Sequence, residues 1–193
     1  MISFVYFDVG GVVIKDFSET NKWKEFLTIT GMSEDDWATN YDGKIDIGIL
    51  PENPKISYDK LLSGFVDRFE INPSIWPVIK KIKKNYRVGL LTNMYPGMLD
   101  LIESHNLLPK INWDVIIDSS LEKAAKADPK IFEIAQNKTG VPGKEILFIE
   151  NSEGHVKAAS DFGWQTFWYD SKNYEDSSHK LEAFFLNESR NTS

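Results

Sequence analysis

Short runs of apolar residues recur along this sequence, and segments with helical patterns separate them. We expect strands at 3–9, 86–93, 113–119, 145–151 and 165–170. The apolar residues in these runs continue with little alternation, which is typical of parallel strands covered on both faces. We expect helices between them at 74–85, 97–108, 128–140 and 153–164. This alternation predicts an α/β fold with a Rossmann-like, doubly wound parallel sheet.

One long segment, 15–77, interrupts the alternation. It is acidic and aromatic, and its aromatic residues recur at mostly helical spacings. The part at 41–55 carries glycine and proline turn signals. We therefore interpret 15–77 as a helical cap inserted after the first strand, and 1–14 together with 78–193 as the α/β core. The cap aromatics are expected to form its packing core.

Composition argues against several function classes. The formal net charge of −7 opposes general attraction to nucleic acid or to an anionic membrane. Because there is no cysteine, neither a disulfide framework nor a zinc–thiolate site can form. Asp8 interrupts the first apolar stretch, which argues against a signal peptide, and no apolar run reaches the length of a membrane span. We expect a cytoplasmic monomer or homodimer that binds neither nucleic acid nor membrane.

Polar side chains end three of the predicted strands. The first strand ends at Asp8, the second at Thr92 and Asn93, and the fourth at Glu150. Because the carboxyl ends of parallel strands meet at one edge of a sheet, these groups are expected to line a ligand crevice. Lys126 precedes the helix that follows the third strand and would add an ammonium group to the crevice.

These groups suit phosphoryl transfer. An aspartate such as Asp8 can attack phosphorus and form an aspartyl-phosphate, which water then hydrolyses. A hydroxyl and an ammonium, here those of Thr92 and Lys126, can hold the phosphoryl oxygens. Asp8 and Glu150 would repel each other unless a cation lay between them, and Mg²⁺ prefers oxygen ligands. Gly10 would let the backbone approach the ligand without a side chain in the way.

Four motifs resemble, in order and spacing, those of the haloacid dehalogenase (HAD) superfamily. "FDVGG" resembles its first motif and "LLTN" its second, which gives Asp8 the nucleophile position and Thr92 the hydroxyl position. "KADPKIF" resembles the third motif and gives Lys126. "FIENSEGHVKAASDFGW" resembles the fourth and gives Glu150 and Asn151.

The resemblance implies a C1-type cap and membership of the branch that contains sugar phosphatases and haloacid dehalogenases. It implies a Mg²⁺-dependent phosphatase acting on a small phosphorylated metabolite, a phosphomonoester, with Asp8 and Lys126 as catalytic residues. Thr92, Asn93 and Lys126 would bind the substrate. Asp8, Glu150 and the carbonyl of Gly10 would place the metal.

Two residues depart from the pattern of the family. Gly10 stands where the family has its usual general acid/base aspartate, and losing such a group costs about 10²- to 10⁴-fold in rate. Glu150 replaces the metal-binding aspartate with a longer arm. These departures motivate an alternative, a catalytically impaired homologue that binds a ligand or partner.

Two further classes are alternatives. A metal-independent haloacid dehalogenase also uses an aspartate nucleophile, and Arg68 is the guanidinium that the predicted cap offers it. A phospho-receiver shares the order of Asp, Thr and Lys but lacks a cap insertion.

Several residues near the motifs have competing interpretations. Lys123 competes with Lys126 as the phosphate ligand, and Glu150 can instead cap the helix that begins near Ser152. We interpret His155 as a surface or packed residue. Asp16 and the acids of 33–36 are expected on a solvated face, although Asp16 can also approach the crevice. These interpretations depend on the three-dimensional arrangement.

Overall fold

Strand β1 (Phe4–Phe7) is buried along its whole length, because both of its faces are covered. Side chains alternate across a strand, so Phe4 and Tyr6 enter one hydrophobic cluster and Val5 and Phe7 enter another. The strand therefore joins two cores, one on each side of the sheet. The structure is a computed structural model that describes residues 1–18 and 20–191.

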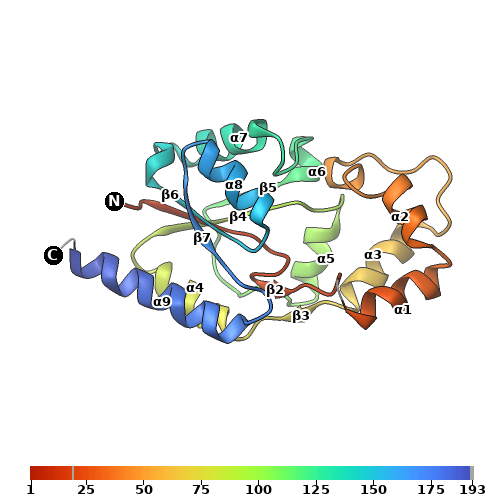
Figure 1. Cartoon of the computed structure of the whole chain (residues 1–193), viewed down its shortest axis with the longest axis horizontal. Helices are drawn as coiled ribbons and strands as arrows, with labels where there is room; N and C mark the ends of the chain where they lie inside the picture. The colour runs from red at the N-terminus through yellow and green to blue at the C-terminus, as the bar shows by residue number, and fades with distance from the viewer. Residues whose placement is uncertain (19, 192–193) are drawn as a thin grey trace.

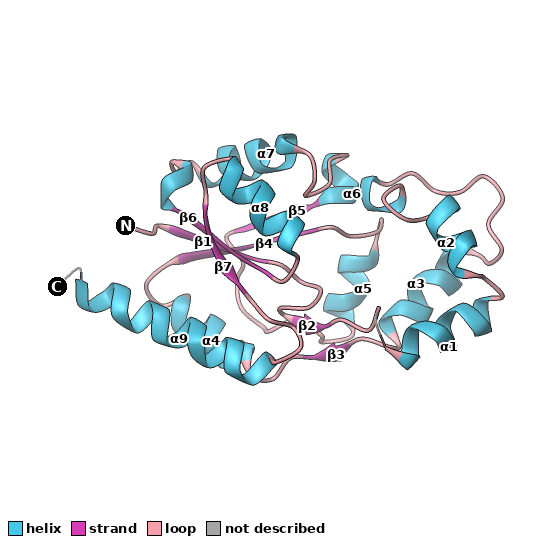
Figure 2. Cartoon of the chain, in the orientation of Figure 1, coloured by secondary structure: helices cyan, strands magenta, loops and turns pink. Residues whose placement is uncertain are grey.

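β1 lies at the centre of a five-stranded sheet with the order β5-β4-β1-β6-β7 (Figure 2). All four neighbouring pairs are parallel, and Phe7 lies opposite both Leu90 and Ile149. The other strands are β4 (Arg87–Thr92), β5 (Val115–Asp118), β6 (Ile146–Glu150) and β7 (Gln165–Trp168). The predicted Rossmann-like α/β fold with a parallel sheet is confirmed, and each predicted strand is present in a shorter form.

Helices cover both faces of this sheet (Figure 1). On one side, α4 (Ile75–Ile82) packs against α9 (Tyr174–Asn191). On the other side lie α7 (Pro129–Thr139) and α8 (Glu153–Asp161). Shorter elements complete the core: α5 (Met98–Ser104), α6 (Ser119–Glu122) and η2 (Gly143–Glu145). Within the described residues, no helix has the length and apolar character needed to cross a membrane.

A group of helices extends from one end of the core as a cap (Figure 1). It consists of α1 (Asn21–Thr30), α2 (Glu34–Asn40), η1 (Ile45–Ile47) and α3 (Tyr58–Val66). The chain enters the cap after β2 (Ile14–Lys15) and returns through β3 (Glu70–Ile71), which pairs with β2 in antiparallel fashion. The cap segment proposed from the sequence, 15–77, ends inside α4, so the return to the core lies a few residues earlier.

Aromatic side chains hold the cap together and attach it to the core. The rings of Phe26 and Phe65 lie 4.6 Å apart inside the cap. Tyr95, from the loop after β4, contacts Phe65 at 5.1 Å and Trp37 at 6.0 Å between ring centres. One hydrophobic cluster therefore continues from the cap into the core beneath β1.

Candidate active site

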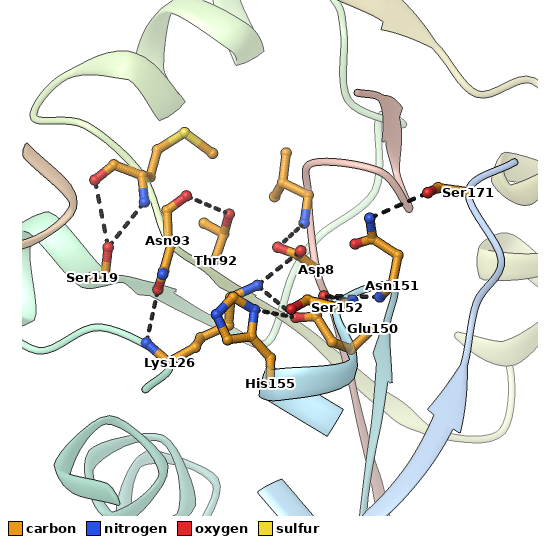
Figure 3. Close-up of polar contacts among 12 residues, drawn as sticks. Asp8, Thr92, Asn93, Ser119, Lys126, Glu150, Asn151, Ser152, His155 and Ser171 are labelled. Atoms are coloured by element: carbon orange, nitrogen blue, oxygen red, sulfur yellow. Dashed lines mark hydrogen bonds and ion pairs between the residues drawn. The ribbon is translucent and has the colours of Figure 1, made fainter. Parts of the chain in front are cut away.

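The carboxyl ends of β1, β4 and β6 meet beneath the cap and bring the predicted groups together (Figure 3). Asp8 follows β1 directly, and Glu150 is the last residue of the adjacent strand β6. Lys126 lies between them. Its Nζ is 2.8 Å from Asp8 Oδ2 and 2.6 Å from Glu150 Oε2. The order of the strands reverses direction between β1 and β6, which is where open α/β sheets bind ligands.

Asp8 is a buried carboxyl group with few hydrogen-bond donors. Its Oδ1 accepts a hydrogen bond from the backbone nitrogen of Val9 at 2.7 Å, and its Oδ2 faces Lys126. Burial raises the pKa of Asp8 to about 7, and the charge of Glu150 adds to the effect, while Lys126 opposes it. Asp8 is thus the carboxylate of this site that most readily accepts a proton.

The Glu150 carboxylate accepts more backbone hydrogen bonds than that of Asp8. Its Oε1 accepts hydrogen bonds from the backbone nitrogens of Asn151 and Ser152 at 2.8 and 2.9 Å, at the start of α8. Its Oε2 faces Lys126 and lies 3.5 Å from Nδ1 of His155. Burial would raise the pKa of Glu150, but Lys126 and His155 outweigh it and lower the pKa to about 2. Glu150 therefore both anchors Lys126 and accepts from the backbone N–H groups of the two residues that precede α8.

Lys126 occupies the place between the two carboxylates where a cation was expected. It is 1% exposed, and its backbone nitrogen donates to Asn93 Oδ1 at 2.9 Å. Burial would lower the pKa of Lys126, but Asp8 and Glu150 together raise it, so the ammonium keeps its charge. The competing Lys123 points elsewhere, because its Nζ lies against Gly48 in the cap.

Thr92 and Asn93 hold different positions at the end of β4. Thr92 is 1% exposed and donates from its hydroxyl to the carbonyl of Asn93 at 3.3 Å. Asn93 lines the cavity above Asp8, whereas Thr92 is absent from the described residues that line it. Asn93 thus positions the Lys126 segment, and the role of Thr92 as a phosphate ligand stays a prediction.

Two oxygen atoms, Gly10 O and Glu150 Oε1, lie beside the side-chain amide of Asn151. In one orientation of the Asn151 amide, its nitrogen donates to Gly10 O and to Glu150 Oε1, each at 3.0 Å. In the other orientation, the amide oxygen of Asn151 faces these two atoms. Figure 3 draws the second orientation, in which Nδ2 donates to Ser171 Oγ at 3.4 Å. Gly11 must be glycine here, because its φ is +79° and a Cβ would lie 2.2 Å from the Asn151 amide.

The described residues include no group of three or more histidine, aspartate or glutamate side chains that could hold a metal ion. The oxygens available at the mouth of the site are those of Asp8, the Gly10 carbonyl and the Asn151 amide. These are hard oxygen donors of the kind that Mg²⁺ binds, and Mg²⁺ sites commonly keep several waters beside one or two carboxylates. Glu150, expected as a metal ligand, has its oxygens occupied by Lys126 and backbone N–H groups.

A cavity of about 500 Å³ separates the core from the cap above these residues. Its core side includes Asp8, Gly10, Asn93, Lys126, Glu150, Asn151 and His155. Its cap side includes the aromatic residues Trp23, Trp37, Phe65 and Phe69 and the acids Asp42 and Asp46. The volume is in the range of small-molecule sites.

Sequence patterns missed several of the lining residues. His155 faces Glu150 and the cavity, although it was interpreted as a surface or packed residue. Asp46 lies on η1, whose backbone is tied to the core because Ser119 donates from its hydroxyl to the Asp46 carbonyl. Burial, helped by the charge of Asp42, raises the pKa of Asp46 to about 6. No local motif marks Asp46, because its place depends on how the cap folds over the sheet.

The fold and this site match a known class of proteins. The sequence profile of the haloacid dehalogenase-like hydrolases matches residues 19–163, more than half of the chain. The chain belongs to this family. The match includes Thr92, Lys126 and Glu150 and begins after Asp8.

Individual relatives agree with this assignment. Mouse acyl-CoA dehydrogenase family member 10 is 29% identical over 112 residues, which is 58% of this chain and 10% of that protein. The (S)-2-haloacid dehalogenase of Pseudomonas putida is 29% identical over 88 residues, which is 45% of this chain and 37% of the enzyme. The chain thus spans a minor part of these curated relatives.

Solved structures share the fold. A HAD family enzyme from Bacteroides thetaiotaomicron, crystallised with magnesium and inorganic phosphate, superposes with a TM-score of 0.72 at 21% identity. The alignment covers 89% of this chain and 96% of that one.

Proposed function

We propose that this HAD-like hydrolase cleaves small phosphomonoesters through Asp8. The observation that carries the proposal is the buried Asp8–Lys126–Glu150 arrangement, which sits at the strand ends and opens into the cavity under the cap. The magnesium and phosphate bound by the similar Bacteroides enzyme support the same chemistry here.

The reaction uses the side chains of this chain in two steps. An oxygen of Asp8 attacks phosphorus, the P–O bond to the alcohol breaks, and the departing oxygen takes a proton from water, because Gly10 offers no acid group. Water then attacks the phosphorus of the aspartyl-phosphate, which releases phosphate and restores the Asp8 carboxylate. Lys126 holds Asp8 in place and offsets the negative charge of the transferred group, while Glu150 keeps Lys126 charged and oriented.

The oxygen donors beside Asp8 fit a magnesium ion. Asp8, the Gly10 carbonyl and the Asn151 amide oxygen would hold it, with Glu150 acting through its hydrogen bonds to the backbone of 151 and 152. When bound, the ion would offset the charge of the phosphate group. Because this donor set has a single carboxylate in direct reach, we expect weak binding that improves when substrate phosphate adds its own oxygens.

Two alternatives make different predictions. Gly10 supplies no carboxyl group, which favours a homologue of low activity that mainly binds its ligand. A dehalogenase needs a group that cradles halide, yet Arg68 donates to the Gly64 carbonyl at 2.7 Å and stacks over Phe26, away from the cavity. The placement of Arg68 thus counts against dehalogenation.

A panel of phosphomonoesters, assayed with Mg²⁺ and with EDTA, tests the proposal. We expect hydrolysis by the wild type that Mg²⁺ increases and that Asp8→Asn lowers by about 10³-fold or more. Chloride release from 2-chloropropionate is measured in parallel. No hydrolysis of any ester, or activity that survives Asp8→Asn, would contradict the proposal, and chloride release would favour the dehalogenase.

A further inference from the structure

The cavity is unusually acidic for a site that takes a phosphate ester. Its lining contains the carboxyl groups of Asp8, Asp16, Asp42, Asp46 and Glu150, whereas Lys126 is the one lysine and no arginine appears among the described lining residues. Asp8 and Glu150 already engage Lys126. A phosphomonoester dianion without other charge would therefore enter a field that repels it.

The excess negative charge lies on the cap side, next to aromatic rings. Asp46 lies on η1 and Asp42 precedes it in the chain, and Trp23 and Trp37 line the same cavity. The two indole rings meet edge to face with 5.1 Å between their centres. Aromatic faces beside carboxylates form the environment in which proteins bind ammonium groups, through cation–π attraction and opposite charge.

The position of these acids is fixed by the fold. The Asp46 carbonyl accepts from Ser119, a residue 0% exposed at the start of α6. The same hydroxyl accepts from the backbone nitrogen of Met94, at 2.9 Å, and Met94 also lines the cavity. The acidic wall therefore faces the Asp8 end of the cavity in the folded chain, with Lys126 and His155 close enough to act on the Asp46 charge.

We infer that the substrate is a phosphomonoester of an amino alcohol, whose ammonium group binds at Asp42, Asp46, Trp23 and Trp37. The inference rests on the proposed hydrolysis and specifies its substrate class. The phosphate end meets Asp8 and Lys126, and the cationic end meets the cap. Such a substrate carries a positive charge that complements the acidic wall.

Matched esters test the inference. Phosphocholine and 3,3-dimethylbutyl phosphate have nearly the same shape, but a carbon replaces the nitrogen in the second. At about pH 8, which is above the pKa of about 6 of Asp46, we expect kcat/KM to favour phosphocholine by about tenfold or more. Asp42→Asn and Asp46→Asn are each expected to bring this ratio toward one. Asp35→Asn, an exposed acid in the first turn of α2, is the control and should keep the wild-type ratio.

Binding of the alcohols alone separates this inference from the hydrolysis. Titration calorimetry with choline and with 3,3-dimethylbutanol should show binding of choline that is at least about tenfold tighter. Equal turnover of both esters would overturn the inference and support the phosphatase. Choline binding without turnover of either ester would support ammonium recognition and overturn the phosphatase. Equal binding of both alcohols would overturn ammonium recognition. Circular dichroism confirms that each variant is folded.

Discussion

Asp8 and Glu150 share one lysine, but the additional contact with His155 lowers the pKa of Glu150, whereas burial raises the pKa of Asp8. Glu150 accepts from two backbone N–H groups, whereas Asp8 accepts from one. A carboxylate is stabilised by each donor that faces it, so the proton goes to Asp8 when one of the pair is neutralised. Asp8, the proposed nucleophile, is thus the less stabilised member of the pair, as suits a group that would leave its contacts to attack phosphorus.

The raised pKa of Asp8 predicts a pH-dependent cost in stability. The folded chain holds the proton of Asp8 up to about pH 7, whereas the unfolded chain releases it near the ordinary value of 3.8. The free energy of unfolding therefore falls as pH rises between these values. Asp8→Asn removes this cost and should raise the free energy of unfolding by about 1–3 kcal/mol above pH 7, with a smaller gain toward pH 4.

Urea unfolding of both proteins across this pH range, in EDTA, measures the difference. A stability difference that is constant with pH would contradict the assigned pKa shift. A variant less stable than the wild type above neutral pH would contradict it as well.

Gly10 predicts a gain of function. A Cβ placed there meets no atom within 4 Å, and Gly10 is not among the glycines with positive φ. Gly10→Asp should therefore fold and place a carboxyl group at the mouth of the site. If proton transfer limits the wild type, kcat for esters of poorly acidic alcohols should rise by about 10²-fold or more.

Gly11→Ala is the matched contrast, since its Cβ would collide with Asn151 and its φ is positive. It should lower both stability and activity. An unchanged kcat in folded Gly10→Asp would show that the missing carboxyl group does not limit turnover.

The sequence predicted the site residues at the strand ends but not the acidic residues on the cap side of the cavity. The places of Asp8, Asn93 and Glu150 follow from local signals, because a strand that stops on a polar residue fixes where that residue lies. Lys126 was recognised from its motif. Asp46 was missed because its place depends on contacts between η1 and α6, which are distant in sequence.

At the scale of elements, one hydroxyl connects three parts of the chain. Ser119 begins α6, accepts from Met94 after β4, and donates to Asp46 in the cap. This connection holds η1 over the cavity. Loss of the hydroxyl leaves the part-buried Asp46 carbonyl and the buried Met94 N–H without this partner, which costs about 1–3 kcal/mol.

Ser119→Ala should therefore loosen the segment 41–55. We expect faster proteolytic cleavage within that segment and a higher KM, while the far-ultraviolet circular dichroism stays unchanged. Ser120→Ala is the control, because the Ser120 hydroxyl donates to Asp118 within the same turn and makes no hydrogen bond to the cap residues that the structure describes. Equal cleavage rates in the two variants would contradict the role of Ser119.

The elements that the sequence predicted best are those with strong internal patterns. Helix α7 begins with Pro129 after the capping residue Asp128 and ends at Gly140, and all three signals are visible in the sequence. The strands β2 and β3 were missed because each has two residues, too few to show a period. Helix α9 was missed because its polar composition hides the buried Leu181 and Phe185.

For the whole molecule, the continuous hydrophobic cluster predicts cooperative unfolding. Phe65 of the cap and Tyr95 of the core belong to the same set of contacts, so the cap gains its packing from the sheet side. Since the chain has no cysteine, Glu25→Cys, an exposed cap position, can carry one fluorescent label. The label and circular dichroism should report the same urea midpoint. A cap transition at lower urea would show that the cap unfolds independently.

The pairing of β2 with β3 means that the chain departs for the cap and comes back at neighbouring points. An inserted segment whose two ends lie side by side can be lengthened, shortened or replaced without straining the core into which it is inserted. The core residues Asp8, Lys126 and Glu150 can then stay unchanged while the cap changes which molecules enter the cavity. Because these two short strands close the base of the cap, the core residues proposed to act on the ligand and the cap residues proposed to select it can change independently in evolution.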